Sequence, residues 1–319
     1  SRIYLLDLKT EEYRLVLGDA NVPSVNLPSR FAADGNGFYF TTDADANFRR
    51  LAYYAIDSGD VTILTEGIDW DVSGLLMSYD RSRGAFSVNA GGRDQLYLFD
   101  PSSQRYKSVS GIPIGRASLG AFSPDNRRLA ITLDTATSPS DIFTLDVSTD
   151  GLDHGAITRW TASEVAGLDV DQFAKPFLIE YPTFDSVDGK PRKIPAWVYK
   201  PRTEGPHPVI ISIHGGPESQ FRPGFSSTFQ QWIAELGAAV IAPNVRGSAG
   251  YGRDYVQLDN GYKREDSVRD IGALLDWIEN QPDLDKERIA VFGGSYGGYM
   301  VLASLVHYSD RLALSLIHI

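Results

Sequence analysis

A Gly-x-Ser-x-Gly pattern lies between a short apolar run and a helix-like segment. The run Gly-Gly-Ser-Tyr-Gly-Gly-Tyr-Met has Ser295 as its central serine. Residues 288–292 predict a buried strand, and residues 299–308 predict a helix with little polar character. Ser295 is therefore expected at a sharp strand-to-helix turn with its hydroxyl exposed. A Cβ at Gly293 or Gly297 would collide with neighbouring backbone, so both positions are expected to require glycine.

A second glycine-rich loop follows an upstream strand-like run. Residues 209–213 are mostly β-branched, as in a strand buried on both faces, and continue into His-Gly-Gly-Pro. A strand, serine turn and helix form the nucleophile elbow of an α/β-hydrolase, where amides stabilise the developing oxyanion. Those donors would be Tyr296 and Gly216 or, failing it, Gly215. We interpret His214 as orienting this loop, because the base in this fold follows the nucleophile. A simple connecting turn is the alternative.

Three motifs, in this order and spacing, resemble the prolyl oligopeptidase family of serine peptidases. They are His-Gly-Gly-Pro, the run Asn-Val-Arg-Gly-Ser-Ala-Gly-Tyr-Gly at residues 244–252, and the elbow. Within the family, the chain is most similar to the acylaminoacyl-peptidase and dipeptidyl-peptidase-like branch. The resemblance implies a β-propeller before an α/β-hydrolase domain, short peptides as substrates, and a Ser-Asp-His triad.

The sequence departs from the family pattern after the elbow. Only 24 positions follow Ser295, whereas the family places its acid and base well beyond that distance. His307 lies on the predicted helix and is carried away by about 1.5 Å per residue. Asp310 is expected to be solvated near the helix end, and His318 lies in a stretch unlike the family's continuation. The chain is therefore expected to be truncated, and a serine without a base is a weak nucleophile.

The first half of the sequence contains a repeat. Pairs of strand-like runs recur, and each second run closes on an aspartate, with separations of 50, 43 and 46 positions. This period is typical of four-stranded propeller blades, with an irregular β-sandwich as the alternative. The expected domains are a partial β-propeller of three to four blades at 1–165, a linker at 166–174, and the N-terminal part of an α/β-hydrolase domain with a mostly parallel, doubly wound sheet at 175–319. The four aspartates are Asp7, Asp57, Asp100 and Asp146.

Composition excludes several classes of function. The net charge is −11, and residues up to Asp171 carry 15 basic and 24 acidic side chains, without a basic patch for nucleic acid. This acidic part could attract basic peptides, although a solvated surface is the simpler interpretation. There are no cysteines, the five histidines are scattered, and no apolar run reaches membrane-span length. No metal, cofactor, nucleic acid or membrane partner is predicted; a homo-oligomer is left open.

Several elements of the second half can be predicted from local signals. Residues 175–181 and 194–199 flank a turn and predict an edge hairpin. Residues 229–236 predict a helix that ends at Gly237. Asp266-Ser267 is expected to cap the next helix, whose apolar stripe is expected to pack in the core. The stripe consists of Val268, Ile271, Leu275 and Ile278.

Three side chains near the motifs have two interpretations each. Arg246 could clamp a substrate carboxylate or pin its loop to a nearby acid, and we favour the structural role. Tyr296 and Tyr299 could shape an acyl pocket or pack at a helix start. The sequence as a whole predicts a serine peptidase that uses Ser295. The alternatives are an esterase on the same fold and a non-catalytic propeller scaffold that binds protein partners.

Overall fold

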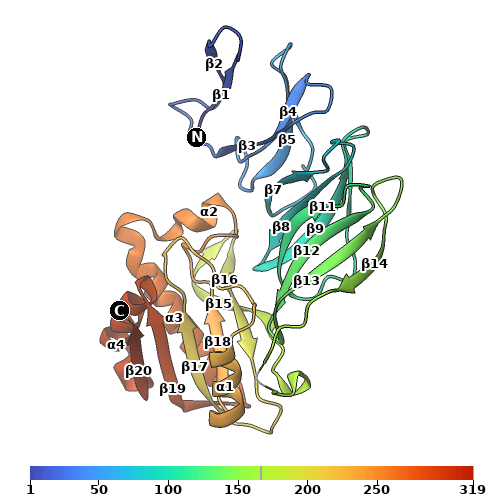
Figure 1. Cartoon of the computed structure of the whole chain (residues 1–319). Coiled ribbons are helices and arrows are strands. Elements are labelled where there is room, and N and C mark those ends of the chain that lie inside the picture. Colours follow the sequence, from blue (N-terminus) through green and yellow to red (C-terminus); the bar gives the residue numbers. More distant parts are fainter. Residues whose placement is uncertain (166, 319) are drawn as a thin grey trace. The chain divides into compact units, whose positions relative to one another are not determined.

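The computed structural model describes residues 1–165 and 167–318, except for the side chain of His318. The chain divides into two compact units (Figure 1). Unit 1 comprises Ser1–Asp134 and Ser140–Ser163, and unit 2 comprises Thr135–Pro139 and Glu164–Ile319. The predicted linker at 166–174 includes residue 166, which lies outside the described residues.

Unit 1 consists of antiparallel sheets. A two-stranded sheet pairs β1 with β2, and three four-stranded sheets follow, each with its strands side by side in chain order. The expected strand pairs are the central strands of these three sheets, β4 with β5, β8 with β9, and β12 with β13. The strands are β1 (Ile3–Leu6), β2 (Tyr13–Leu17), β3 (Asn26–Phe31), β4 (Gly37–Thr42), β5 (Arg50–Ala55), β6 (Val61–Ile63), β7 (Asp71–Met77), β8 (Gly84–Ala90), β9 (Arg93–Asp100), β10 (Arg105–Ser108), β11 (Gly115–Phe122), β12 (Arg128–Thr135), β13 (Ser138–Val147) and β14 (His154–Arg159).

The middle four-stranded sheet contributes to two hydrophobic cores. Successive side chains of a strand point to opposite faces. In β8, Phe86 and Val88 therefore pack in one core with residues of the preceding sheet. Ala85 of the same strand, with Leu96 and Leu98 of β9, packs in a second core with residues of the following sheet. The sheets of unit 1 are thus stacked face to face through apolar side chains, as propeller blades are.

A serine–aspartate turn recurs in unit 1. In each case the serine hydroxyl donates to the aspartate two residues later, and a backbone amide two residues beyond donates to the same carboxylate. A further amide donates back to the serine hydroxyl. These contacts close the turns from β7 to β8, from β11 to β12 and from β13 to β14. The pairs are Ser78–Asp80, Ser123–Asp125 and Ser148–Asp150.

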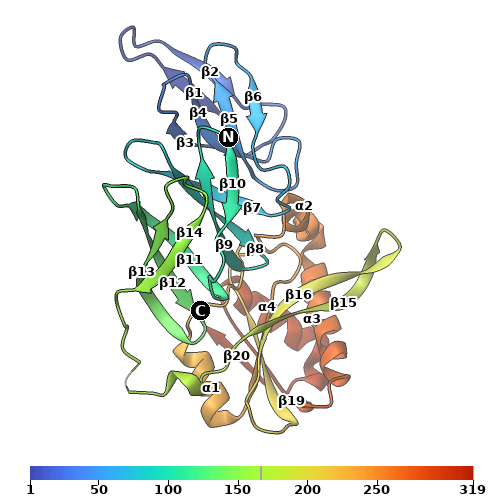
Figure 2. The ribbon, with the colours of Figure 1, turned by 90° about the vertical axis from the view of Figure 1, so that its right-hand side faces the viewer.

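Unit 2 is built on a mixed six-stranded sheet with the order β15-β16-β18-β17-β19-β20. The first two strands form an antiparallel hairpin, whose turn extends beyond the sheet in Figure 2. β16 is antiparallel to β18, and the remaining strands run parallel to one another. The strands are β15 (Phe177–Val187), β16 (Lys190–Tyr199), β17 (His207–Ile213), β18 (Ala239–Pro243), β19 (Leu284–Gly294) and β20 (Leu314–His318).

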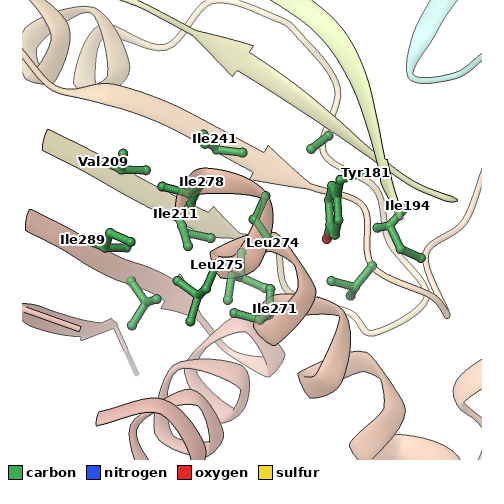
Figure 3. Close-up of a cluster of buried hydrophobic side chains, with 14 of the residues drawn as sticks. Tyr181, Ile194, Val209, Ile211, Ile241, Ile271, Leu274, Leu275, Ile278 and Ile289 are labelled. Carbon is green, nitrogen blue, oxygen red and sulfur yellow. The ribbon is translucent and has the colours of Figure 1, made fainter. Parts of the chain in front are cut away.

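Helices pack against both faces of this sheet. Trp197 and Tyr199 of β16 share a core with Phe229 and Ile233 of α1. The alternate residues of β16 belong to the core that contains the apolar stripe of α3 and residues of α4. Figure 3 shows this second core, in which Ile271, Leu274, Leu275 and Ile278 of α3 lie against the strands. The helices are α1 (Ser227–Leu236), α2 (Arg253–Val256), α3 (Arg264–Glu279) and α4 (Tyr296–Tyr308), with 3-10 turns at Val170–Gln172, Gln257–Asp259, Gly261–Lys263 and Ser309–Arg311.

Most element ends agree with the sequence signals, and one prediction is wrong. α1 ends at Gly237, whose φ of 60° lies in the left-handed region that favours glycine. However, Asp266-Ser267 does not cap α3, which begins at Arg264 directly after a 3-10 turn. Ser267 lies inside the helix, where its hydroxyl donates back to the carbonyl oxygen of Arg264 at 2.7 Å. A serine in the first helical turn can bond in this way without acting as a cap.

Candidate functional site

Ser295 lies at the turn between β19 and α4, as predicted. Its φ of 55° and ψ of −121° are unusual for a residue with a side chain, and the residue is exposed. A Cβ on Gly293 would lie 2.4 Å from the carbonyl oxygen of Gly297, and a Cβ on Gly297 would lie 2.2 Å from that of Ile213. Such approaches are too short for real Cβ contacts. The two glycines therefore allow the turn to form tightly against the strand and its neighbour.

The His-Gly-Gly-Pro loop lies beside this turn. β17 pairs in parallel with β19, with Ile213 opposite Gly293, so both strands end at the same edge of the sheet. A Cβ on Gly215 would lie 3.4 Å from Cβ of Ser295 and 3.9 Å from its Oγ. The backbone of the loop therefore approaches the serine closely, which the absence of a side chain at Gly215 makes possible.

Backbone amides of the predicted oxyanion site are available for a ligand. Tyr296 is the first residue of α4, so its amide has no partner within the helix. Within residues 1–165 and 167–318, the amides of Tyr296, Gly215 and Gly216 donate no hydrogen bond to a protein acceptor. Gly216 has a φ of 138°, and a Cβ there would lie 2.8 Å from the amide nitrogen of Ser219. Glycine is therefore required at Gly216 as well.

His214 holds the loop. Its Nδ1 lies 2.6 Å from the carbonyl oxygen of Gly215, and its Nε2 lies 2.9 Å from Oγ of Ser248. Burial lowers the pKa of His214 despite the opposing effect of the Gly215 hydrogen bond, so the imidazole is neutral at pH 7. Because a carbonyl oxygen only accepts, Nδ1 carries the proton and donates to Gly215. Nε2 faces the Ser248 hydroxyl, whose Oγ also lies 2.7 Å from the carbonyl oxygen of Val245 and has one proton for the two acceptors. The Nδ1 contact thus lies within the His-Gly-Gly-Pro loop, and the Nε2 contact joins this loop to Ser248 in the loop after β18.

The loop that follows β18 is fixed by Asn244, which is fully buried. Its side chain accepts from the amide of Phe221 at 2.7 Å and donates to the Phe221 carbonyl at 3.1 Å and the Tyr251 hydroxyl at 2.8 Å. The amide of Ala249 donates to the carbonyl of Ser219 at 2.8 Å. The side chain of Asn244 and the amide of Ala249 therefore connect the loops after β17 and β18 by separate hydrogen bonds.

Arg246 is a structural anchor in this arrangement. Its Nε and Nη2 donate to both oxygens of Asp270 at 2.9 and 2.8 Å, and Nη2 also lies 2.8 Å from Oδ1 of Asp185. The guanidinium also lies 4.3 Å from the ring centroid of Phe184. Arg246 is 3% exposed and Asp270 is fully buried. The guanidinium is occupied by these carboxylates, in agreement with the structural interpretation of this residue.

The side chain of Tyr296 points to α3 and the turn before it. Its hydroxyl lies 2.9 Å from Oγ of Ser267 and 3.5 Å from Oδ2 of Asp259, and Arg264 lies 5.4 Å from its ring centroid. Arg264 also pairs with Asp259, which is 1% exposed. Burial raises the pKa of Asp259, although Arg264 opposes that shift. These contacts hold the side chain of Tyr296, the residue whose backbone amide is the first in α4.

Gly247 completes the packing around Asp259. A Cβ on Gly247 would lie 2.2 Å from Oδ1 of Asp259, and Gly247 has a φ of 89°. The glycine of the Arg-Gly-Ser sequence therefore lets the loop after β18 contact a buried carboxylate. Sequence reasoning missed Asp185, Asp259 and Asp270. Arg246 lies 61 positions from Asp185 and 24 from Asp270, and Tyr296 lies 37 from Asp259, although Arg264 is only five positions from Asp259.

The described side chains that follow the elbow, His307 and Asp310 among them, make no hydrogen bond to Ser295. Nε2 of His307 lies 3.4 Å from a carboxylate oxygen of Glu265, which also accepts from the hydroxyl of Tyr299 at 2.7 Å. Asp310 lies in the 3-10 turn after α4. Gly294 pairs with residue 318 in the parallel ladder, but the side chain of His318 lies outside the described residues.

Within the part of the chain that the structure describes, no side chain hydrogen bonds to Oγ of Ser295. No group of three or more histidine or acidic side chains that could hold a metal is present among those residues. None of the described helices combines the length and apolar character that a membrane crossing requires. The site therefore presents an exposed serine hydroxyl beside free backbone amides.

Several known peptidases are similar to this chain. Residues 223–318 match the model of the prolyl oligopeptidase family. Dipeptidyl-peptidase 5 of Schizosaccharomyces pombe is 34% identical over 323 residues, covering 92% of this chain and 43% of that protein. Dipeptidyl aminopeptidase BIII of Pseudoxanthomonas mexicana is 27% identical over 302 residues, covering 90% of this chain and 41% of that protein. This chain thus spans about two fifths of the length of these relatives.

A solved prolyl endopeptidase structure shares the fold. It superposes with a TM-score of 0.81 at 18% sequence identity, covering 98% of this chain and 44% of that chain. The matched segment at 223–318 includes α1, the Asn-Val-Arg loop and the elbow with Ser295. The family model at residues 223–318 and the curated relatives match the chain to the prolyl oligopeptidase family.

Proposed function

We propose that this chain is part of a serine peptidase in which Ser295 attacks the carbonyl carbon of a peptide bond. The observation that carries the proposal is the turn at Ser295, with its positive φ of 55° and its exposed hydroxyl beside Gly215. Attack would form a tetrahedral intermediate, whose oxyanion would accept hydrogen bonds from the amides of Tyr296 and of Gly216 or Gly215. Loss of one such donor raises the barrier by about 3 kcal/mol.

The proton of Ser295 needs an acceptor during this attack. His214 is neutral but its ring nitrogens bond to Gly215 and Ser248, and His307 lies beside Glu265. We therefore place the general base and the acid that orients it in sequence outside these 319 residues, in a longer protein. That placement is supported by the chain's coverage of only 41% and 43% of its two relatives. These 319 residues alone would then be a poor or inactive catalyst.

We extend the same proposal to the architecture of the two units. The three four-stranded sheets of unit 1 would be blades of a partial β-propeller, and the mixed sheet of unit 2 would be the N-terminal part of an α/β-hydrolase domain. The stacking of consecutive antiparallel sheets and the elbow at the end of a parallel strand support this assignment. The boundaries at 1–165, 166–174 and 175–319 remain a prediction.

Short peptides are the proposed substrates. The relatives named above are a dipeptidyl peptidase and a dipeptidyl aminopeptidase, and peptidases of this family act on peptide bonds. An esterase on the same fold is the nearest alternative, and relative turnover of matched ester and amide substrates would separate the two. A binding scaffold would instead retain its function in Ser295→Ala.

The proposal is tested by active-site labelling. The source gene is sequenced beyond codon 319, and the extended protein is treated with a fluorophosphonate probe, which reacts with activated serines. We expect labelling at Ser295 that disappears in Ser295→Ala, and a downstream histidine and aspartate whose replacement also abolishes labelling. A folded extended protein without labelling would contradict the peptidase proposal and favour the scaffold.

A further inference from the structure

Tyr296 contributes both a proposed oxyanion donor and a side chain that contacts α3. Its backbone amide directly follows Ser295 and is the first in α4, so no hydrogen bond within the helix fixes its direction. Its hydroxyl lies 2.9 Å from Oγ of Ser267 in α3. A catalytic group must be held within about 0.5 Å of its productive position, which requires supporting contacts around it. The side chain of Tyr296 is therefore an attachment, besides the backbone, that can hold the amide in place.

The Tyr296 hydroxyl ends a directed chain of hydrogen bonds. Oγ of Ser267 donates its single proton to the carbonyl oxygen of Arg264 at 2.7 Å, since Sδ of Met300 at 3.5 Å is the weaker acceptor. The Tyr296 hydroxyl is therefore the donor in its contact with the same Oγ. Burial raises the pKa of Tyr296, although hydrogen bonds with Ser267 and Arg264 oppose the shift, so the phenol keeps its proton at pH 7. Ser267 is fully buried, so bulk water does not compete for this contact.

Arg264 and Asp259 also contact the Tyr296 side chain. The guanidinium carbon of Arg264 lies 5.4 Å from the ring centroid, within the range of a cation–π contact. Nη1 of Arg264 donates to Oδ2 of Asp259 at 2.5 Å, and this Oδ2 lies 3.5 Å from the Tyr296 hydroxyl. Asp259 is 1% exposed and packs against Gly247, so it has little room to move. Two residues of α3 and one of the preceding turn thus contact the Tyr296 side chain.

We propose that Ser267 is a positioning residue for the oxyanion donor, because its contact with the Tyr296 hydroxyl holds the backbone amide of Tyr296 in the direction that the oxyanion requires. This inference rests on the function proposed at Ser295, and Ser267 acts through Tyr296 and not on the reacting atoms. Displacement of a catalytic group by about 1 Å can lower a rate by about 100-fold. Loss of one anchoring hydrogen bond should cost less, about tenfold in the rate of the chemical step.

The test measures how fast a fluorophosphonate probe labels Ser295 in the protein extended beyond codon 319. Ser295 attacks phosphorus and fluoride leaves, and the phosphoryl oxygen takes the place of the oxyanion, so the rate depends on the same amides. Rates at several probe concentrations separate the maximal rate of labelling from the half-saturating concentration. We expect Ser267→Ala to lower the maximal rate by about tenfold and to leave the half-saturating concentration within about twofold. A loss of folded protein alone would lower the labelled fraction and not the rate.

A double-mutant cycle shows whether Ser267 acts through Tyr296. Tyr296→Phe removes the same contact from its other partner, so it should lower the maximal rate by a similar factor. Because one contact can be lost only once, the double variant of Ser267→Ala and Tyr296→Phe should also be about tenfold slower than the original protein. Independent effects would instead multiply to about 100-fold.

Ser304→Ala is the matched control. Ser304 is also fully buried in a helix, and its hydroxyl donates to the carbonyl oxygen of Met300 at 2.7 Å, as that of Ser267 does to Arg264. Among the described residues, its hydroxyl makes no hydrogen bond with Tyr296. Its replacement displaces no catalytic group and should leave the maximal rate within about twofold.

Four results would each overturn the inference. They are an unchanged rate in Ser267→Ala, a raised half-saturating concentration in place of a lowered maximal rate, equal slowing in Ser304→Ala, and effects of Ser267→Ala and Tyr296→Phe that multiply. In each case the original extended protein is labelled, so the function proposed at Ser295 stands. A folded, extended protein that is not labelled would contradict that function and this inference with it.

Discussion

The serine–aspartate turns of unit 1 and the loops near Ser295 use carboxylates in opposite ways. In those turns, Asp80, Asp125 and Asp150 are exposed and accept hydrogen bonds from residues two to three positions away, and Asp80 also accepts from the side chain of Asn126 at 2.7 Å. In unit 2, Asp259 and Asp270 are almost fully buried and pair with arginines. Exposed local contacts contribute little individually, whereas a buried charge that loses its partner is costly. The comparison predicts that the loops near Ser295 are far more sensitive to substitution than the turns of unit 1.

The largest effect is expected from Arg246→Met. This substitution leaves Asp270 buried without its main partner, and loss of one member of a buried pair costs about 3–5 kcal/mol. The free energy of unfolding, measured by urea denaturation, should fall by that amount. The matched control is Arg288→Met, which removes an exposed pair with Asp285 and should cost at most about 1 kcal/mol. Equal losses in the two variants would show that burial does not distinguish these pairs.

A smaller but still large effect is expected from Gly297→Ala. Its new Cβ would lie 2.2 Å from the carbonyl oxygen of Ile213, so the elbow must shift away from β17. Overpacking of this kind costs about 1–3 kcal/mol. Gly67→Ala in unit 1 is the control, because its Cβ would meet only the Tyr106 hydroxyl at 3.8 Å. The thermal midpoint should fall in the first variant and stay nearly constant in the second; the reverse order would refute the proposed steric role.

Tyr296→Phe should have an intermediate effect. It removes the hydroxyl that lies 2.9 Å from Oγ of Ser267, while Ser267 keeps its bond to the Arg264 carbonyl. The free energy of unfolding should fall by about 1 kcal/mol, as for a typical hydrogen bond. Tyr262→Phe is the control, since Tyr262 is fully exposed. If the two variants have the same stability, the contact with Ser267 does not anchor the start of α4.

The smallest effect concerns the exposed turns of unit 1 and is visible only at low pH. Hydrogen bonds from Ser82 and Ser78 lower the pKa of Asp80 to about 2, and those from Ser148 and Leu152 lower that of Asp150 to about 2. Because these folded-state values lie below the usual 3.8, the stabilisation is complete above about pH 4 and is lost as the pH falls toward 2.

The corresponding measurement is the stability of the chain between pH 5 and pH 2. An Asp80→Asn and Asp150→Asn double variant should lose less stability over this range than the original chain does. A Glu11→Gln and Glu12→Gln variant, altered at exposed positions of the hairpin between β1 and β2, is the control and should follow the original profile. If the double variant has the same pH profile of stability as the original chain, these aspartates do not have the proposed role.

The difference between local and long-range contacts also explains how much of the structure could be predicted from the sequence. The strand before Ser295, the helix after it, the glycines around it and the end of α1 at Gly237 follow from local patterns. The recurring strand pairs of unit 1 are equally local, since antiparallel neighbours follow one another in the chain. By contrast, the sequence predicts the start of α3 at Asp266-Ser267, whereas the helix begins at Arg264. Ser267 lies inside the helix, where its hydroxyl contacts Tyr296 and the carbonyl oxygen of Arg264.

Contacts between segments that are distant in sequence could not be predicted from the sequence. Arg246 was expected to have either a substrate or a protein acid as its partner, and only the fold brings Asp185 and Asp270 to it. The interpretation of His214 as a loop-orienting residue rested on chain order, whereas its partner Ser248 is visible only in three dimensions.

The most direct test of the account is fluorophosphonate labelling of Ser295 in the protein extended beyond codon 319, compared with the 319-residue chain. The account predicts strong labelling of the extended protein, loss of labelling in Ser295→Ala, and weak or no labelling of the shorter chain. Equal, strong labelling of both proteins would contradict the placement of the base outside these residues. No labelling of a folded, extended protein would contradict the nucleophilic role of Ser295.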